Sequence, residues 1–218
     1  MDKAVVMNNR LPPPYRESIE RCFGSNTEGG EALSDDNLLN FIAEGDRDAF
    51  AVLMKRYLTR MVTLAQRIVF DREQAKEIAQ EAFLRVWQHA HKWNPEGSAT
   101  FLTWLHRVVV NLSISRRRRF RDQVSLDVIE ELPSGLADGF DFIAASDKKR
   151  IVREALEKLP ERQRAAVALY YFDDLPQIQA AEIMEMTPRA FDSLIVRARV
   201  NLKKYLADFG FRRQEDLS

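Results

Sequence analysis

Residues 176–206 contain two helical patterns separated by a three-residue break. Before the break, Pro176 suits the first turn of a helix, where its missing N–H costs nothing. After it, Thr187 is a natural N-cap and Pro188 a natural first helical residue. Apolar residues then recur at helical spacing, at Phe191, Leu194, Ile195, Ala198 and Leu202. This arrangement is typical of a helix-turn-helix, whose second helix can enter a DNA major groove. An ordinary helical hairpin with a solvated basic face also fits these residues.

Charge is unevenly distributed, although the 33 basic and 33 acidic side chains of the chain cancel. Residues 49–121 carry 14 basic and 5 acidic side chains, and residues 148–206 carry 12 and 8. Between these blocks, residues 122–147 hold 7 acidic side chains and no basic one. Because blocks of one sign say more about partners than the net charge does, the two basic blocks remain compatible with a nucleic-acid partner.

Helical spacing continues upstream, and no strand pattern stands out. Ser34 is predicted to cap a helix that Gly45 closes, a second helix covers about 46–69, and Asp71 is predicted to cap a third. After a loop at 94–98, a fourth helix covers 101–121. Two more precede Pro176, and the second of these is predicted to start at Pro160 and to run through Tyr170. We therefore predict an all-α fold with two small helical domains joined by a flexible acidic linker. The predicted parts are a flexible extension at 1–33, a domain at 34–121, the linker at 122–147, a second domain at 148–206 and a tail at 207–218.

The chain offers no pattern for catalysis or metal binding. Its single cysteine, Cys22, and its scattered histidines do not form a zinc motif. His89 and His91 are two positions apart on a predicted helix, so their side chains diverge. No phosphate-binding loop or dinucleotide motif is present, and no apolar run approaches the roughly 18–20 residues that span a bilayer. We expect a cytoplasmic protein that is not an enzyme and needs no cofactor or metal.

Two motif sets resemble sigma-70 family initiation factors, most of all the small extracytoplasmic-function (ECF) class. The segment at 71–120 resembles domain 2 of the family through Asp71, Glu77, Gln80-Glu81, Phe83, Trp87, Trp104-Leu105, Asn111-Leu112 and Arg116–Arg119. The later segment resembles domain 4, with Leu159-Pro160 and Arg164 at its start and Arg197-Ala198-Arg199 at its end. The two sets occur in the order and with the linker that the family has.

The resemblance implies a factor that binds core RNA polymerase and promoter DNA, under the control of an anti-sigma factor. Contacts to the clamp helices of the largest polymerase subunit are implied for Asp71, Glu77, Gln80 and Glu81. The loop at 92–100 and the following helix would capture an unstacked base of the minus-10 element, through Trp93, Asn94, Ser98, Thr100, Trp104, Asn111, Ser115, Arg116, Arg117, Arg118 and Arg119. The helix-turn-helix at 177–197 and its continuation would read the minus-35 element, through Thr187, Arg189, Asp192, Ser193, Arg197 and Arg199.

Some positions differ from the family pattern. Ser115 stands where Asp is frequent, and Glu185 or Met186 where the turn often has Gly. Asp192 and Leu194 replace a frequent basic pair, which predicts an unusual minus-35 preference; Asp192 could accept a hydrogen bond from a cytosine amino group. Two other interpretations remain: a helix-turn-helix regulator that acts without polymerase, and an adaptor or anti-sigma antagonist that mimics the fold.

Overall fold

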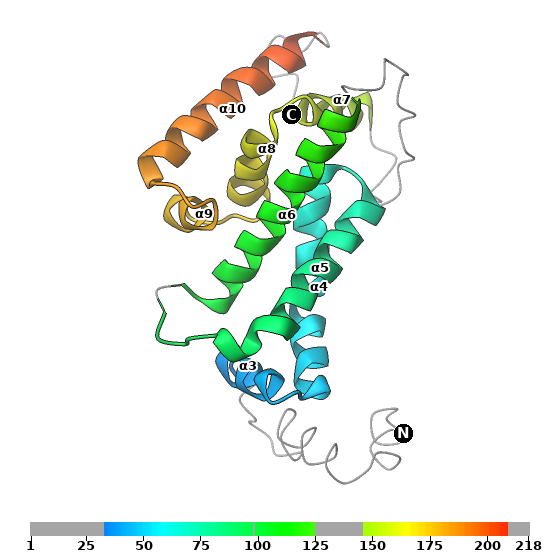
Figure 1. The fold of residues 1–218 in the computed structure, drawn as a ribbon. Helices are drawn as coiled ribbons and strands as arrows, with labels where there is room; N and C mark the ends of the chain where they lie inside the picture. Colours follow the sequence, from blue (N-terminus) through cyan, green and yellow to red (C-terminus); the bar gives the residue numbers. More distant parts are fainter. Residues whose placement is uncertain (1–32, 98, 125–145, 209–218) are drawn as a thin grey trace. The chain divides into compact units, whose positions relative to one another are not determined.

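The computed structural model describes residues 33–97, 99–124 and 146–208, and all regular structure in these ranges is helical (Figure 1). The all-α prediction is therefore confirmed. The predicted extension, Ser98, most of the acidic linker and most of the tail lie outside the described residues. In chain order the elements are α3 (Asp35–Ala43), α4 (Arg47–Val69), α5 (Arg72–His89), the 3-10 turn η1 (Ala90–Lys92), α6 (Phe101–Val124), α7 (Ser146–Glu157), α8 (Glu161–Val167), the π-helical turn η2 (Ala168–Phe172), α9 (Gln177–Ile183) and α10 (Pro188–Asp208).

The chain gathers into two compact units whose border cuts through α4 and α5. The first unit comprises residues up to 59 together with 81–101, and the second comprises 60–80 together with all residues from 102 onward. The two predicted domains, 34–121 and 148–206, were defined from sequence motifs, and their bounds differ from those of the compact units. They remain a prediction.

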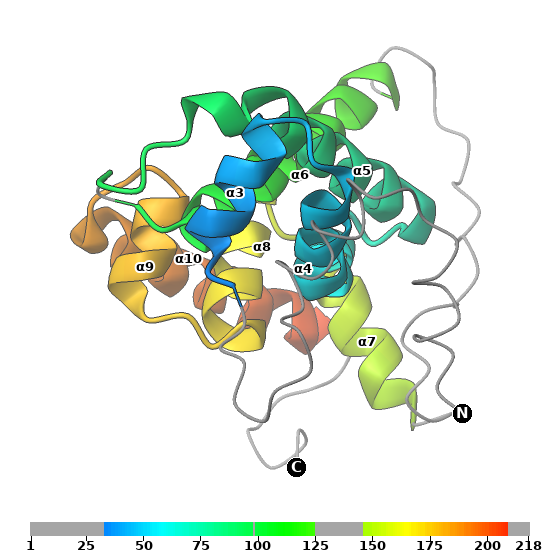
Figure 2. The same ribbon diagram turned by 90° about the horizontal axis from the view of Figure 1, so that it is seen from below.

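The first unit is built on α3, which packs against η1. Figure 2 shows α3 beside the segment that leads from η1 to α6. Inside the unit, the Phe50 ring lies edge-on to Phe83, with centroids 6.3 Å apart, and to Trp87, with centroids 5.3 Å apart. The buried apolar side chains come from all its elements: Leu38, Leu39, Ile42, Ala49, Leu53, Ala82, Phe83, Val86, Ala90 and Phe101. Shared burial of these side chains holds α3 in place.

In the second unit, α10 packs along α8, with α9 at its N-terminal end and α7 also in contact (Figure 1). A buried cluster of Leu156, Leu159, Val167 and Ala198 lies between these helices. Phe70, which follows α4, packs against this cluster. The predicted apolar stripe of the last helix is confirmed, because Phe191, Leu194, Ile195 and Ala198 are buried and Leu202 is partly buried against the cluster.

Two helices end in the same hydrogen-bonded turn but use different residues at its left-handed position. After α3, Gly45 has φ +89°, its N–H donates to the Ile42 carbonyl, and the next N–H donates to Phe41. After α9, Glu185 has φ +54°, its N–H donates to the Glu182 carbonyl, and the Met186 N–H donates to Ala181. Both are Schellman motifs, in which glycine is the usual residue. The turn of the helix-turn-helix therefore holds a glutamate in a strained backbone conformation.

Two predicted helix ends differ from the structure. The helix expected over 101–121 continues to Val124. The helix that starts after Pro160 does not run regularly through Tyr170: α8 ends at Val167 and widens into η2, where the Asp173 N–H donates to the Ala168 carbonyl five positions back. Side-chain periodicity changes little when one turn widens, so the sequence pattern did not reveal it.

Candidate nucleic-acid interface

The predicted polymerase contacts lie on and before α5. Glu77 and Gln80 are exposed, and Glu81 is half-buried and pairs with Arg85 at 3.1 Å. Asp71 precedes the helix, and its carboxylate accepts from the Gln74 backbone N–H at 2.9 Å and from the Gln74 side-chain amide at 3.1 Å. The predicted N-cap is confirmed. The Asp71 carboxylate is thus used within the chain.

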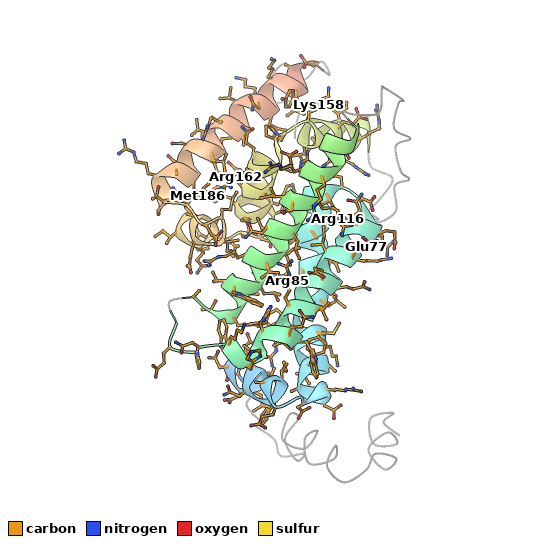
Figure 3. All side chains as sticks on the ribbon, in the orientation of Figure 1. Glu77, Arg85, Arg116, Lys158, Arg162 and Met186 are labelled. Atoms are coloured by element: carbon orange, nitrogen blue, oxygen red, sulfur yellow. The ribbon has the colours of Figure 1, made fainter. Side chains whose placement is uncertain are left out.

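Glu77 on α5 pairs with Arg116 on α6, with 2.7 Å between Oε2 and Nη1 (Figure 3). The resemblance assigned these two residues to different partners, polymerase and DNA. Their side chains remain 58% and 39% exposed, so both can still reach a partner. The ion pair connects the two candidate surfaces.

The loop between η1 and α6 forms a tight turn around Asn94. The Asn94 side-chain oxygen accepts from the Glu96 N–H, and its carbonyl accepts from the Gly97 N–H, both at 3.0 Å. A Cβ at Gly97 would lie 3.0 Å from the Asn94 carbonyl oxygen, so glycine keeps this turn close. Asn94 and Thr100 are exposed, whereas Ser98 lies outside the described residues.

Trp93 is half-buried at the start of this loop. Its indole N–H donates to Asp36 Oδ1 at 2.8 Å, and its ring lies edge-on to Phe101 with centroids 5.9 Å apart. Asp36 was not among the predicted site residues, because it lies 57 positions before Trp93 and no local motif connects them.

Along α6, Asn111 and Ser115 are exposed at a spacing of four, on one side of the helix. Trp104 and Arg117 are half-buried, and Arg118 and Arg119 are exposed. A further basic residue, Arg107, was not predicted. It donates to the Glu182 carbonyl at 3.1 Å and lies 3.9 Å from the Glu182 carboxylate and 3.8 Å from that of Glu185. Arg107 thereby fastens α6 to the end of α9.

The N-terminal half of α10 exposes a polar side. Thr187 Oγ1 accepts from the Ala190 N–H at 3.2 Å, which confirms the predicted cap. Arg189, Asp192 and Ser193 are exposed, and the Ser193 hydroxyl donates back to the Arg189 carbonyl at 3.0 Å. These residues are available to a partner at the start of the helix.

Arg197 and Arg199 lie on opposite flanks of α10, because two positions on a helix are about 200° apart. Arg197 Nε donates to the Ser193 carbonyl at 3.1 Å. Arg199 donates instead to the hydroxyl of Tyr171 in η2, and its guanidinium lies 5.6 Å from the centre of that ring. The two arginines therefore point to different sides of the helix, and Tyr171 is an unpredicted neighbour of Arg199 in the site.

Leu194 requires a correction. The sequence suggested that Asp192 and Leu194 together alter the DNA-facing surface, but the Leu194 side chain is only 7% exposed. It belongs to the apolar stripe that holds α10 in place. Of the two positions, only Asp192 lies on the exposed surface.

Comparisons with known proteins identify the family of the chain. The family model for sigma-70 region 2 matches residues 53–123, and that for sigma-70 region 4 matches residues 149–202. The ECF RNA polymerase sigma factor SigW of Bacillus subtilis is 30% identical over 177 residues, which are 77% of this chain and 94% of the relative. The ECF sigma-E factor of Escherichia coli K12 is 29% identical over 179 residues, covering 78% and 92%. The chain belongs to the ECF class of sigma-70 family sigma factors.

Solved structures show the same fold for this sigma factor. CnrH, in complex with the cytosolic domain of CnrY, aligns with a TM-score of 0.58 and 22% identity, covering 80% of this chain and 97% of CnrH. RpoE of Bartonella quintana, in complex with the anti-sigma factor NepR, aligns with a TM-score of 0.59 and 18% identity, covering 72% and 96%. As a sigma factor, the protein acts in transcription initiation.

Within residues 33–97, 99–124 and 146–208, no three His, Cys, Asp or Glu side chains are grouped so that they could hold a metal ion. In the same ranges, no helix has both the length and the apolar character needed to cross a membrane.

Proposed function

We propose that this sigma factor binds core RNA polymerase and directs promoter-specific initiation through two separate DNA contacts. The observation that carries the proposal is the presence of both family regions in order, each with an exposed polar surface at the predicted positions. In this proposal, Glu77, Gln80 and Glu81 contact the clamp helices of the largest polymerase subunit. Asp71 acts there mainly as the cap that starts α5.

The minus-10 element is assigned to the loop 93–100 and to α6. Asn94 and Thr100 would contact a base that leaves the stack, while Asn111, Ser115 and the arginines hold the backbone of the opened strand. Arginine side chains suit that role, because they neutralise phosphates without reading sequence. The exposure of Asn111, Ser115 and Arg119 supports this assignment.

The minus-35 element is assigned to the start of α10, in the major groove. Arg189, Asp192 and Ser193 would face base edges, since residues near the N-terminus of a recognition helix make such contacts. Arg197 and Arg199 would contact phosphates on the two sides of the groove, in keeping with their opposite flanks on the helix. Asp192 would favour a cytosine amino group over an acceptor.

Control by an anti-sigma factor completes the proposal. The solved structures of CnrH and RpoE contain CnrY and NepR, respectively, and we infer a regulator of the same kind for this chain. The protein would work in the cytoplasm without enzymatic activity of its own, with 34–121 and 148–206 as its two functional domains.

Run-off transcription tests the proposed function. Purified full-length protein is added to core RNA polymerase with genomic promoter fragments, and specific transcripts are expected. The variant Glu77→Lys, which reverses the charge of an exposed side chain on α5, should reduce polymerase binding, whereas Glu73→Lys at the start of the same helix serves as the control.

Each alternative gives a different result in this assay. Tight, specific binding of duplex DNA by the free protein, without polymerase binding, would indicate a helix-turn-helix regulator. Binding to a sigma-like partner without transcription would indicate an adaptor or antagonist. Either result would contradict the proposed function.

A further inference from the structure

The first turn of α3 supplies two carboxylates to two different parts of the chain. Asp35 accepts from the Tyr57 hydroxyl and pairs with Arg56, both on α4. The neighbouring Asp36 accepts from the Trp93 indole N–H at 2.8 Å. The start of α3, which Ser34 caps, therefore bridges α4 and the beginning of the 93–100 loop.

Aromatic contacts close this bridge into a ring of side chains. Trp93 lies edge-on to Phe101, at an interplanar angle of 87°, and the Phe101 ring lies 5.9 Å from that of Tyr57. Phe101 is only 2% exposed and begins α6. The circuit runs from Tyr57 through Asp35, Asp36 and Trp93 to Phe101 and back. It fastens both ends of the loop, Trp93 at the start and Phe101 at the end.

Between these fixed ends, the loop turns on Asn94 and Gly97 and exposes its tip. A loop whose ends are fixed loses less conformational freedom when it takes hold of a ligand. The Trp93 N–H is used by Asp36, and its ring packs against Phe101 in a T-shaped arrangement, so the N–H is not available to DNA. Its place in the circuit indicates an anchor.

We propose that Asp36 is a positioning residue for minus-10 recognition, because it holds Trp93 and thereby the base-capturing loop. This inference rests on the proposed function of that loop. It moves Trp93 from the set of DNA contacts to the structure behind them, and it gives α3 a part in promoter opening.

The first test needs no polymerase. Hydrogen exchange is measured in the full chain at the hydrogen-bonded amides of Trp93, Glu96 and Gly97. Asp36→Ala should exchange about tenfold faster at these amides, since a hydrogen bond to a charged group is lost. Asp36→Asn keeps an acceptor oxygen and should stay close to the unaltered protein. Asn40→Ala, an exposed change on the same helix, is the matched control. Unchanged exchange in Asp36→Ala would overturn the proposal.

The second test follows promoter opening by polymerase reconstituted with each variant, using permanganate reactivity of minus-10 thymines. Asp36→Ala and Trp93→Phe should each slow opening of a duplex promoter about tenfold, and their combination should add little because both remove the same bond. Asp36→Asn should retain most of the rate. Polymerase binding, and transcription from a premelted template, should not change.

The outcomes separate this proposal from the proposed function. Faster loop exchange with a normal opening rate would overturn the positioning role, and additive losses in the double variant would overturn the coupling of Asp36 to Trp93. If the unaltered protein opened no promoter, the proposed function would fall and the positioning role with it. The exchange experiment would still decide whether Asp36 anchors the loop.

Discussion

Arg164 donates from Nη1 to the carbonyl oxygen of Ile68 at 2.7 Å, although 96 positions separate the two residues. Ile68 is the second-last residue of α4. The same guanidinium donates to the carbonyls of Leu156, Glu157 and Leu159 at 3.1, 2.6 and 2.9 Å, where α7 ends. Helix C-termini carry carbonyls without helical partners and a partial negative charge. One buried cation therefore satisfies the ends of two helices of the second unit.

Replacing Arg164 should destabilise the protein more than replacing Arg162, the other arginine of α8. Arg164→Met leaves four carbonyls without this donor, and we expect the free energy of unfolding to fall by about 3 kcal/mol. Arg162→Ala, at an exposed position of the same helix, should change it by about 0.5 kcal/mol or less. Urea unfolding measures both values. Equal stability of the two variants would contradict the capping role. Burial lowers the pKa of Arg164 to about 10, so the side chain remains charged at neutral pH.

The left-handed turn at Glu185 predicts a stabilising change. Glu185→Gly should raise the free energy of unfolding by about 0.5–1 kcal/mol, because a residue with a Cβ is strained at φ +54° and glycine is not. Glu182→Gly, inside α9, should instead destabilise by about 1 kcal/mol. Thermal unfolding of the two variants compares them directly. A loss of stability in Glu185→Gly would mean that the ion pair of Glu185 with Arg107 outweighs the strain.

The Tyr57 hydroxyl predicts a loss of stability at alkaline pH. Burial, followed by the hydrogen bond to Asp35, raises the pKa of Tyr57 from 10.0 to about 12. The folded chain therefore holds this proton more firmly than the unfolded chain. The resulting stability is complete below pH 10 and is lost as the pH rises toward 12.

Tyr57→Phe removes this dependence and provides the measurement. At pH 8 the free energy of unfolding of the variant should be about 1 kcal/mol lower than that of the unaltered protein, because the hydrogen bond is lost. This difference in free energy should shrink between pH 10 and 12. Denaturant unfolding across that range follows it. A difference that stays constant with pH would show that Tyr57 titrates alike in both states.

The ion pair between Glu77 and Arg116 predicts unequal contributions within the arginine run. Promoter binding by the reconstituted polymerase is measured against salt concentration. Arg119→Ala should reduce the salt slope by about 0.7, the value for one phosphate contact on single-stranded DNA. Arg116→Ala should reduce it less, because Glu77 already balances that charge. With Glu77→Ala in the background, the effect of Arg116→Ala should grow. Equal salt slopes for Arg116→Ala and Arg119→Ala in the unaltered background would mean that the ion pair between Glu77 and Arg116 breaks when the protein binds DNA.

Sequence patterns predicted the helix-turn-helix and its boundaries well. Thr187 caps α10 and Pro188 begins it as expected, and Ser34 and Asp71 cap the helices that follow. Pro176 lies one residue before its expected place, as the N-cap of α9. Such signals are local, since a cap depends on residues two or three positions away. The π-helical turn at 168–172 was missed because the widening of one turn changes the side-chain periodicity little.

Which side of a helix a candidate residue occupies was harder to predict. Leu194 matched both the apolar stripe and a DNA-facing position of the family pattern, and only packing placed it in the core. Arg199 matched a basic motif, yet its closest partner is Tyr171, 28 positions earlier. Aligned motifs give residue identity, whereas contacts depend on which helices come together.

The sequence by itself determined the helical class, most helix boundaries and the family to which the chain belongs, because periodicity, caps and motif order are properties of neighbouring residues. Tertiary structure alone decided that Arg164 closes α4 as well as α7, that Asp36 holds Trp93, and that Glu77 meets Arg116. Those partners lie 39–96 positions apart. A polar side chain that loses water on folding takes whichever partner the packed helices bring within hydrogen-bonding distance, and linear spacing does not encode that choice.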